Sequence, residues 1–156
     1  MYWSSYSSIH GAELDGANRQ IIASMSRYNL YGVQGIALDV DMNRIFFTTP
    51  RYGSVSYIDL NTSDPSAEEL ASWYAHYGAL YGITVGDQYV YYTLQWFQQN
   101  GGMVYETNKT KGSRHSAISV MELVYPRGIA VQRGNTTRKS ECTYFLHLGP
   151  FHTKAS

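Results

Sequence analysis

The sequence has little cysteine, no excess charge and no long apolar run, and each shortage excludes a class of protein. Its 156 residues include a single cysteine, so a disulfide framework within the chain is excluded. Twelve Lys and Arg residues balance twelve Asp and Glu residues, giving a formal net charge of zero. The basic surface of a nucleic-acid-binding protein is therefore missing, and nucleic acid is not an expected partner.

Membrane and targeting segments are not expected within the chain. No stretch approaches about 18 consecutive apolar residues, which a transmembrane helix requires. The first residues also lack the charged segment and apolar run of a signal peptide. If the parent protein is a receptor, its anchor lies outside this sequence.

Motifs that carry catalytic chemistry are absent from the sequence. It contains no Gly-x-Ser-x-Gly elbow, no His-Glu-x-x-His pair, no P-loop and no Cys-x-x-Cys. The five histidines lie at no spacing typical of metal ligands: His10, His76, His115, His147 and His152. We therefore expect no catalytic residue, no metal site and no cofactor.

The chain does contain an internal repeat, which two separate markers place at about 45 residues. An aromatic pair followed by small residues occurs as Tyr2-Trp3, Phe46-Phe47 and Tyr91-Tyr92. A glycine followed by apolar residues occurs at Gly35, Gly82 and Gly128. Four short apolar segments in a repeat of this length are typical of β-propeller blades, whereas helical repeats would show apolar residues at 3.6 spacing.

The first repeat carries a family resemblance. It reads Tyr2-Trp3-Ser4-Ser5, then Leu14-Asp15-Gly16-Ala17-Asn18-Arg19, then Gly35-Ile36-Ala37-Leu38-Asp39. This pattern resembles the Tyr-Trp-Thr-Asp repeat, the class B repeat of the low-density-lipoprotein receptor family, over about residues 1–131. The resemblance implies an all-β fold, with about three four-stranded blades of a six-bladed propeller.

One motif residue departs from that family. The resemblance implies that the final Asp of the motif ties neighbouring blades through hydrogen bonds to backbone. Here Ser5, Thr49 and Leu94 take its place. This link between blades is therefore not expected in this chain.

We expect the propeller part to span residues 1–134, with repeats at about 1–43, 44–87 and 88–134. Each repeat is expected to form one blade that ends with its glycine-led strand. The expected strands are Met1–Ser5, Ile9–Leu14, Arg19–Ser24 and Gly35–Asp39; Arg44–Thr48, Ser54–Leu60, Glu69–Trp73 and Gly82–Val85; Gln88–Thr93, Gly102–Thr107, His115–Met121 and Gly128–Val131.

A local helix signal conflicts with the repeat in the second blade. Asp64-Pro65 followed by the capping-box spacing of Ser66 and Glu69 favours a helix start. The repeat places a strand at residues 69–73. Because tertiary pairing overrides local propensity, we expect the strand.

Residues 135–156 form an expected C-terminal tail that contains Cys142. Taken alone, Cys142 is a lone cytosolic thiol. The resemblance implies instead that it is the first cysteine of a truncated module similar to epidermal growth factor.

Three Asn-x-Ser/Thr sequons occur, at Asn61, Asn108 and Asn135, where chance would give about one. Asn61 and Asn108 fall in the turns between the second and third strands of their repeats, where a glycan can be accommodated. The sequons predict an extracellular glycoprotein.

Neighbouring strands of a blade run in opposite directions, so successive connections lie on opposite faces and the sequons mark one of these faces. The connections that follow the first strand and precede the fourth lie on the face opposite the sequons. The predicted binding residues on that face are Tyr6, Gln34, Arg51, Tyr81, Trp96 and Arg127. Tyr, Trp and Arg dominate binding energy at interfaces, although loop aromatics also cap propeller cores. Lys109, on the sequon face, is expected to be neutral for binding.

The expected function is non-enzymatic. The resemblance implies the extracellular, ligand-binding and ligand-releasing part of a low-density-lipoprotein receptor-related protein at the cell surface, in endocytosis or Wnt-type signalling. Its partners would be a lipoprotein, a Wnt-type ligand or antagonist, or a matrix protein, together with the missing blades and the module similar to epidermal growth factor. The alternatives are a secreted nidogen-like matrix-binding protein and, from a different class, a propeller hydrolase.

Overall fold

The computed structural model describes residues 1–5, 8–24, 32–50, 52–63, 65–73, 78–97, 101–110, 114–118, 126–132 and 143–148. The regular elements within these ranges are β-strands. No helix long and apolar enough to cross a membrane occurs among the described residues.

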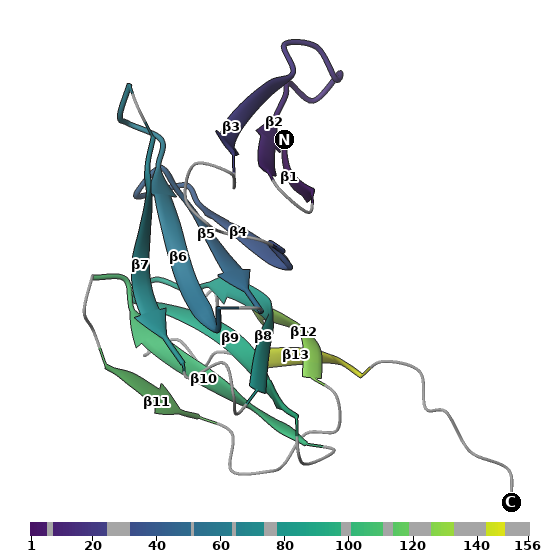
Figure 1. The fold of residues 1–156 in the computed structure, drawn as a ribbon, viewed down its shortest axis with the longest axis vertical. Helices are drawn as coiled ribbons and strands as arrows, with labels where there is room; N and C mark the ends of the chain where they lie inside the picture. The colour runs from purple at the N-terminus through teal and green to yellow at the C-terminus, as the bar shows by residue number, and fades with distance from the viewer. Residues whose placement is uncertain are drawn as a thin grey trace, which may run out of the picture.

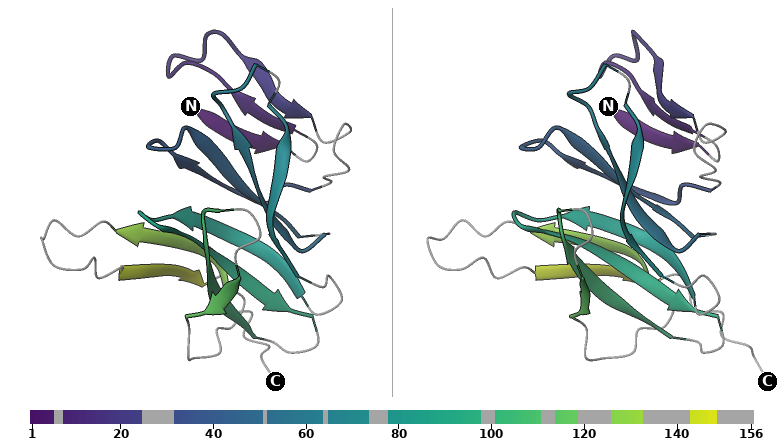
Figure 2. Two further views of the ribbon diagram at one scale, coloured as in Figure 1. Left: turned by 90° about the vertical axis from the view of Figure 1, so that its left-hand side faces the viewer. Right: turned by 60° about the vertical axis from the view of Figure 1, so that its left-hand side comes forward.

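The strands form four antiparallel sheets that follow one another in chain order. Figures 1 and 2 show the first three sheets stacked along the molecule, with β12 and β13 beside the third. The first sheet has the order β1-β2-β3, the second β4-β5-β6-β7, the third β11-β10-β9-β8, and β12 pairs with β13. The bounds are β1 Tyr2–Ser5, β2 Ser8–Gly11, β3 Gln20–Ser24, β4 Gly35–Asp39, β5 Arg44–Thr49, β6 Ser54–Asp59, β7 Ala67–Ser72, β8 Gly78–Val85, β9 Tyr89–Trp96, β10 Gly102–Asn108, β11 His115–Ala117, β12 Pro126–Gln132 and β13 Thr143–Leu148.

The sheet boundaries fall one strand earlier than the sequence repeats predict. The expected last strand of the first repeat, β4, pairs with β5 and lies in the second sheet. The reason is the tight turn at residues 40–43, in which the Asn43 amide donates to the Val40 carbonyl at 3.4 Å and Asn43 has a φ of 51°. Asn tolerates this conformation better than most residues do. A repeat gives the length of a blade but leaves its phase open, and the turn chemistry decides the phase.

The strand prediction for the second blade is confirmed over the local helix signal. β7 pairs with β6, and its residues Leu70 and Ala71 are buried. An apolar pair that completes a sheet and enters the core contributes more than a capping box at a helix start.

Two other expectations were wrong. β2 ends at Gly11 rather than Leu14, and Leu14 is exposed in the turn that follows. Residues 143–148, assigned to a tail outside the propeller, form β13 and pair with β12. Cys142 lies outside the described residues.

The core lies between successive sheets. Ile45 and Phe47 of β5 pack with Ile9 of the first sheet. Phe46, which alternates with them, packs with Leu80 of the third sheet and other apolar residues there. Successive side chains of a strand point to opposite faces. The aromatic pair of the second repeat, Phe46-Phe47, therefore supplies one side chain to each of two interfaces between sheets.

A buried threonine joins the second and third sheets. The Thr48 hydroxyl accepts a hydrogen bond from the Gly35 amide at 3.1 Å and donates one to the Tyr81 carbonyl oxygen at 2.7 Å. In the third sheet, the Thr93 hydroxyl accepts from the Gly82 amide at 2.9 Å. A link between blades is therefore made after all, by the third motif residue rather than by the missing Asp.

Thr49, which stands where the family motif has its final Asp, forms a hydrogen bond within its own hairpin. Thr49 is fully buried, and its hydroxyl lies 2.5 Å from the hydroxyl of Ser54 on the neighbouring strand β6.

Gly35→Ala is expected to lower the free energy of unfolding by about 1–3 kcal/mol, the usual range for overpacking. A Cβ at this position would lie 2.4 Å from the Tyr81 carbonyl oxygen, a backbone atom that cannot move aside easily. Denaturant unfolding followed by circular dichroism measures the loss. The neighbouring exposed residue Gln34 provides the control, because Gln34→Ala should leave the midpoint unchanged. Equal midpoints for the two variants would show that the strands beside Gly35 move apart to accommodate the added methyl group without loss of stability.

Candidate functional site

Three connections leave the sheets at the same end. They follow β5, β7 and β9, and the antiparallel order of the strands requires their common placement. A hydrogen bond between two of them supports it: the Trp73 amide, after β7, donates to the Gly53 carbonyl, after β5, at 2.7 Å. We call the described aromatic residues at this end, Tyr52, Trp73, Trp96 and Phe97, the aromatic face.

The structure describes some of the predicted binding residues. Gln34 is exposed directly before β4, and Tyr81 is half-buried within β8. Both lie next to Thr48, because the Gln34 amide donates to the Thr48 carbonyl at 3.0 Å and the Tyr81 carbonyl accepts from the Thr48 hydroxyl. Trp96 is half-buried and packs against the core between the second and third sheets. The structure thus brings Gln34 and Tyr81 together, at the same end as Trp96.

The other predicted residues are described in part or not at all. Tyr6 and Arg51 lie outside the described residues. Arg127 is a backbone position of β12, at an irregularity in the strand pairing between Pro126 and Gly128.

The sequence prediction missed two exposed aromatic residues of this face, Tyr52 and Phe97. Phe97 was missed because β9 was expected to end at Thr93, whereas the strand continues to Trp96. This extension pairs Trp96 with Gly78 and leaves Phe97 in the connection, with 61% of its surface exposed. The unbroken run of strand-forming residues from Tyr89 to Trp96 was the available signal.

The sequons that the structure describes lie at the opposite end. Asn61 is exposed in the turn after β6, where its amide and side chain both donate to Asp59 Oδ1, at 2.9 and 3.0 Å. Asn108 is exposed at the end of β10, and its side-chain oxygen accepts from the Thr110 amide at 3.3 Å. Asn135 lies outside the described residues.

Lys109 is buried rather than exposed on the sequon face, and its neutrality for binding stays a prediction. Its ammonium lies 2.5 Å from Asp39 Oδ2, and the two side chains are 7% and 0% exposed. Asp39 ends β4 in the second sheet, whereas Lys109 follows β10 in the third. Burial raises the pKa of Asp39, but the hydrogen bonds from Lys109 and from the Met42 amide and the charge of Lys109 outweigh it and hold this pKa below its ordinary value. A second link between these sheets is therefore ionic.

Two described histidines lie against tryptophan rings, His10 stacked on Trp3 and His115 tilted against Trp73. His10 lies 5.4 Å from Trp3, measured between ring centroids, and His115 lies 4.1 Å from Trp73. Burial lowers the pKa of His115. Within the described part of the chain, no group of three or more His, Cys, Asp or Glu side chains is placed to hold a metal ion.

Comparisons with known proteins identify the fold. The sequence matches no known protein family, and no curated protein matches it. A chain in the crystal structure of a nidogen/laminin complex matches with a TM-score of 0.68 and 21% identity, over 84% of this chain and 48% of that one. The chain folds as β-propeller blades. A luciferin-regenerating enzyme also matches, with a TM-score of 0.57 and 13% identity, over 80% of this chain and 39% of the enzyme. The chain thus spans less than half the length of either structure.

Proposed function

We propose that the chain is a protein-binding part of an extracellular β-propeller and that its aromatic face is the binding surface. The observation that carries this proposal is the placement of exposed aromatic residues, Tyr52 and Phe97, at the end opposite the exposed sequons. Large aromatic side chains supply much of the energy of protein interfaces. A glycan at the other end would leave this face uncovered.

The partner that the comparisons support best is a matrix protein. The nidogen/laminin structure contains a propeller of this fold together with a protein partner. A secreted nidogen-like protein is therefore one setting for the chain. A low-density-lipoprotein receptor-related protein, acting in endocytosis or Wnt-type signalling, is the other, and it rests on the repeat motifs alone. In both settings the chain is proposed to be non-enzymatic.

The extracellular setting predicts glycans at Asn61 and Asn108. Both residues are exposed, so the transferase can reach them during secretion. The chain is expressed with an added signal peptide, and peptide mass spectrometry after enzymatic deglycosylation detects Asn converted to Asp. Unmodified Asn at both positions would remove the support for an extracellular location.

Binding should depend on the aromatic face. Phe97→Ala and Trp96→Ala are expected to weaken binding to immobilised laminin by about 1–3 kcal/mol if these residues anchor the partner. Surface plasmon resonance measures the change in Kd. Trp96→Ala also removes contacts with the core, so Phe97→Ala is the cleaner variant.

The control lies at the other end of the sheets. Gln88 is exposed in the turn between β8 and β9, and Gln88→Ala should leave the Kd unchanged. Lys109 cannot serve as this control because it is buried. If Gln88→Ala weakens binding as much as Phe97→Ala does while both variants stay folded, the face assignment is wrong.

A further inference from the structure

The outer edge of β1 lacks a strand that the other sheets possess. β4 pairs with the edge of β5, and β8 pairs with the edge of β9. In each pair a glycine amide donates to a buried threonine hydroxyl, Gly35 to Thr48 and Gly82 to Thr93. Ser4 stands at the corresponding place in β1. β1 pairs only with β2 among the described strands, so the Ser4 hydroxyl has no glycine-led strand beside it.

β12 has the complementary property. It contains Gly128-Ile129, the third such pair after Gly35-Ile36 of β4 and Gly82-Ile83 of β8. In the pairing of β12 with β13, the residue opposite Gly128 is His147. No hydroxyl residue therefore occupies the position that Thr48 and Thr93 take in the second and third sheets.

The face of the first sheet is also uncovered. Ile45 and Phe47 of β5 are 1% and 0% exposed because the first sheet packs on them. Their counterparts in the first repeat, Met1 directly before β1 and Trp3 within it, are 48% and 36% exposed. A propeller covers each blade face with its neighbour, so this face is built to receive another blade.

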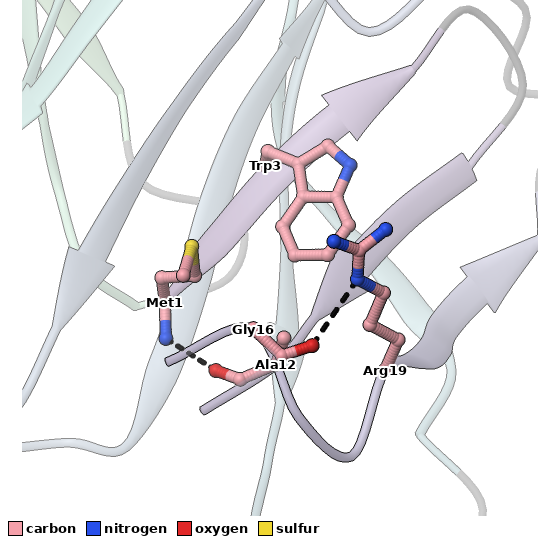
Figure 3. Close-up of a pocket in the computed structure, with 5 residues that line it drawn as sticks. All are labelled: Met1, Trp3, Ala12, Gly16 and Arg19. Atoms are coloured by element: carbon pink, nitrogen blue, oxygen red, sulfur yellow. Dashed lines mark hydrogen bonds between the residues drawn. The ribbon is translucent and has the colours of Figure 1, made fainter. Parts of the chain in front are cut away.

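A pocket lies on this uncovered face. It has a volume of about 270 Å³ and is lined by Met1, Trp3, Ala12, Gly16 and Arg19. In Figure 3 the Trp3 ring and the Arg19 guanidinium lie side by side at its wall. The indole ring of Trp3, the Met1 side chain and the apolar stem of Arg19 are more favourably placed against the side chains of a packed blade than in water.

The count of strands fits a second copy of the chain. The first sheet has three strands, and the second and third have four each. If a β12 strand pairs with the edge of β1, all three sheets have four strands. A two-fold axis relating two halves closes a ring and leaves no bare edge.

We propose that two copies of this chain close one propeller by exchanging β12. In this dimer β12 of one copy leaves β13 and pairs with β1 of the other, with Gly128 opposite Ser4. The expected register follows that of β4 and β5, in which Ala37 faces Phe46. Ala130 of one copy then faces Tyr2 of the other. Formation of this dimer does not require the proposed ligand.

Cross-linking between copies tests the register. In the full chain carrying Cys142→Ser, one preparation carries Tyr2→Cys and a second carries Ala130→Cys, and the two are mixed and oxidised mildly. A disulfide-linked dimer of the two variants is expected. The matched control replaces Ala130→Cys by Gln132→Cys, which is two residues out of register on the same strand face. Equal yields from the two mixtures, or no cross-link in either, would overturn the proposed pairing.

Sedimentation of the full chain tests the exchange itself. A defined dimer is expected at micromolar concentration, tightened by Ser4→Thr and weakened at least about fivefold by Ser4→Ala, the effect of one hydrogen bond. Phe145→Pro should also tighten the dimer, because proline in β13 removes a competing strand from β12, whereas Phe145→Ala keeps the backbone pairing. A chain that stays monomeric, or a dimer that Phe145→Pro weakens, would overturn the proposal and assign the edge of β1 to another segment of a longer parent protein.

Discussion

Lys109→Met is expected to destabilise the fold by about 3–5 kcal/mol, because it leaves the buried carboxylate of Asp39 without a countercharge. The two side chains are almost fully enclosed, and each belongs to a different sheet. The loss should therefore appear as an earlier separation of the second and third sheets. Denaturant unfolding at neutral pH, followed by tryptophan fluorescence and circular dichroism, measures it.

A second ion pair of the same chain provides the control. Arg44 lies 3.2 Å from Asp59, but both side chains are partly exposed. Arg44→Met should cost clearly less than Lys109→Met does, because a partly exposed ion pair contributes little to stability. The double variant Asp39→Asn with Lys109→Met should recover part of the loss, because it removes the charge that Lys109 compensates. A cost for Lys109→Met no larger than that for Arg44→Met would show that Asp39 reaches water.

The pH dependence of this effect has a definite sign. The pKa of Asp39 is lowered in the folded chain relative to the ordinary value of 3.8. The carboxylate therefore stabilises the fold above pH 3.8, and this contribution is lost as the pH falls through the folded pKa. The difference in stability between wild type and Lys109→Met should shrink over the same interval.

The repeat predicted the strands well because it depends on local sequence. The aromatic pairs and the glycine-led segments mark strands wherever they occur, and they were enough to override the helix signal before β7. The grouping of strands into sheets could not be predicted in the same way. It depends on whether β4 pairs with β3 or with β5, and the turn that ends at Asn43 decides this.

The site was harder to predict because its properties depend on contacts between distant residues. Lys109 follows a sequon asparagine in a turn, which indicates exposure, yet Asp39 binds it from another sheet. Thr48 looks like an ordinary strand residue until Tyr81 of the next sheet is placed beside it. Trp96 and Phe97 differ by one position, and only the length of β9 decides which of them is more exposed.

Phe47→Ala is expected to cost about 3–5 kcal/mol, the usual range for removing a buried aromatic ring. Phe47 is fully buried between the first and second sheets, where it packs with Ile9 and Ile45. The surrounding strands are held by their own pairing and cannot close the cavity fully. Thermal unfolding of the purified chain gives the change in Tm.

Trp3→Ala is the matched comparison, because Trp3 holds the same motif position in β1. In dilute monomer it should cost clearly less than Phe47→Ala does, since Trp3 is 36% exposed whereas Phe47 is fully buried. In the proposed dimer the second copy covers this face. Trp3→Ala should therefore lower the free energy of dimerisation by more than it lowers the free energy of unfolding of the monomer. An equal loss for Trp3→Ala and Phe47→Ala at a concentration where only monomer sediments would mean that the first sheet is already covered within one chain, and β12 exchange would then have no open face to fill.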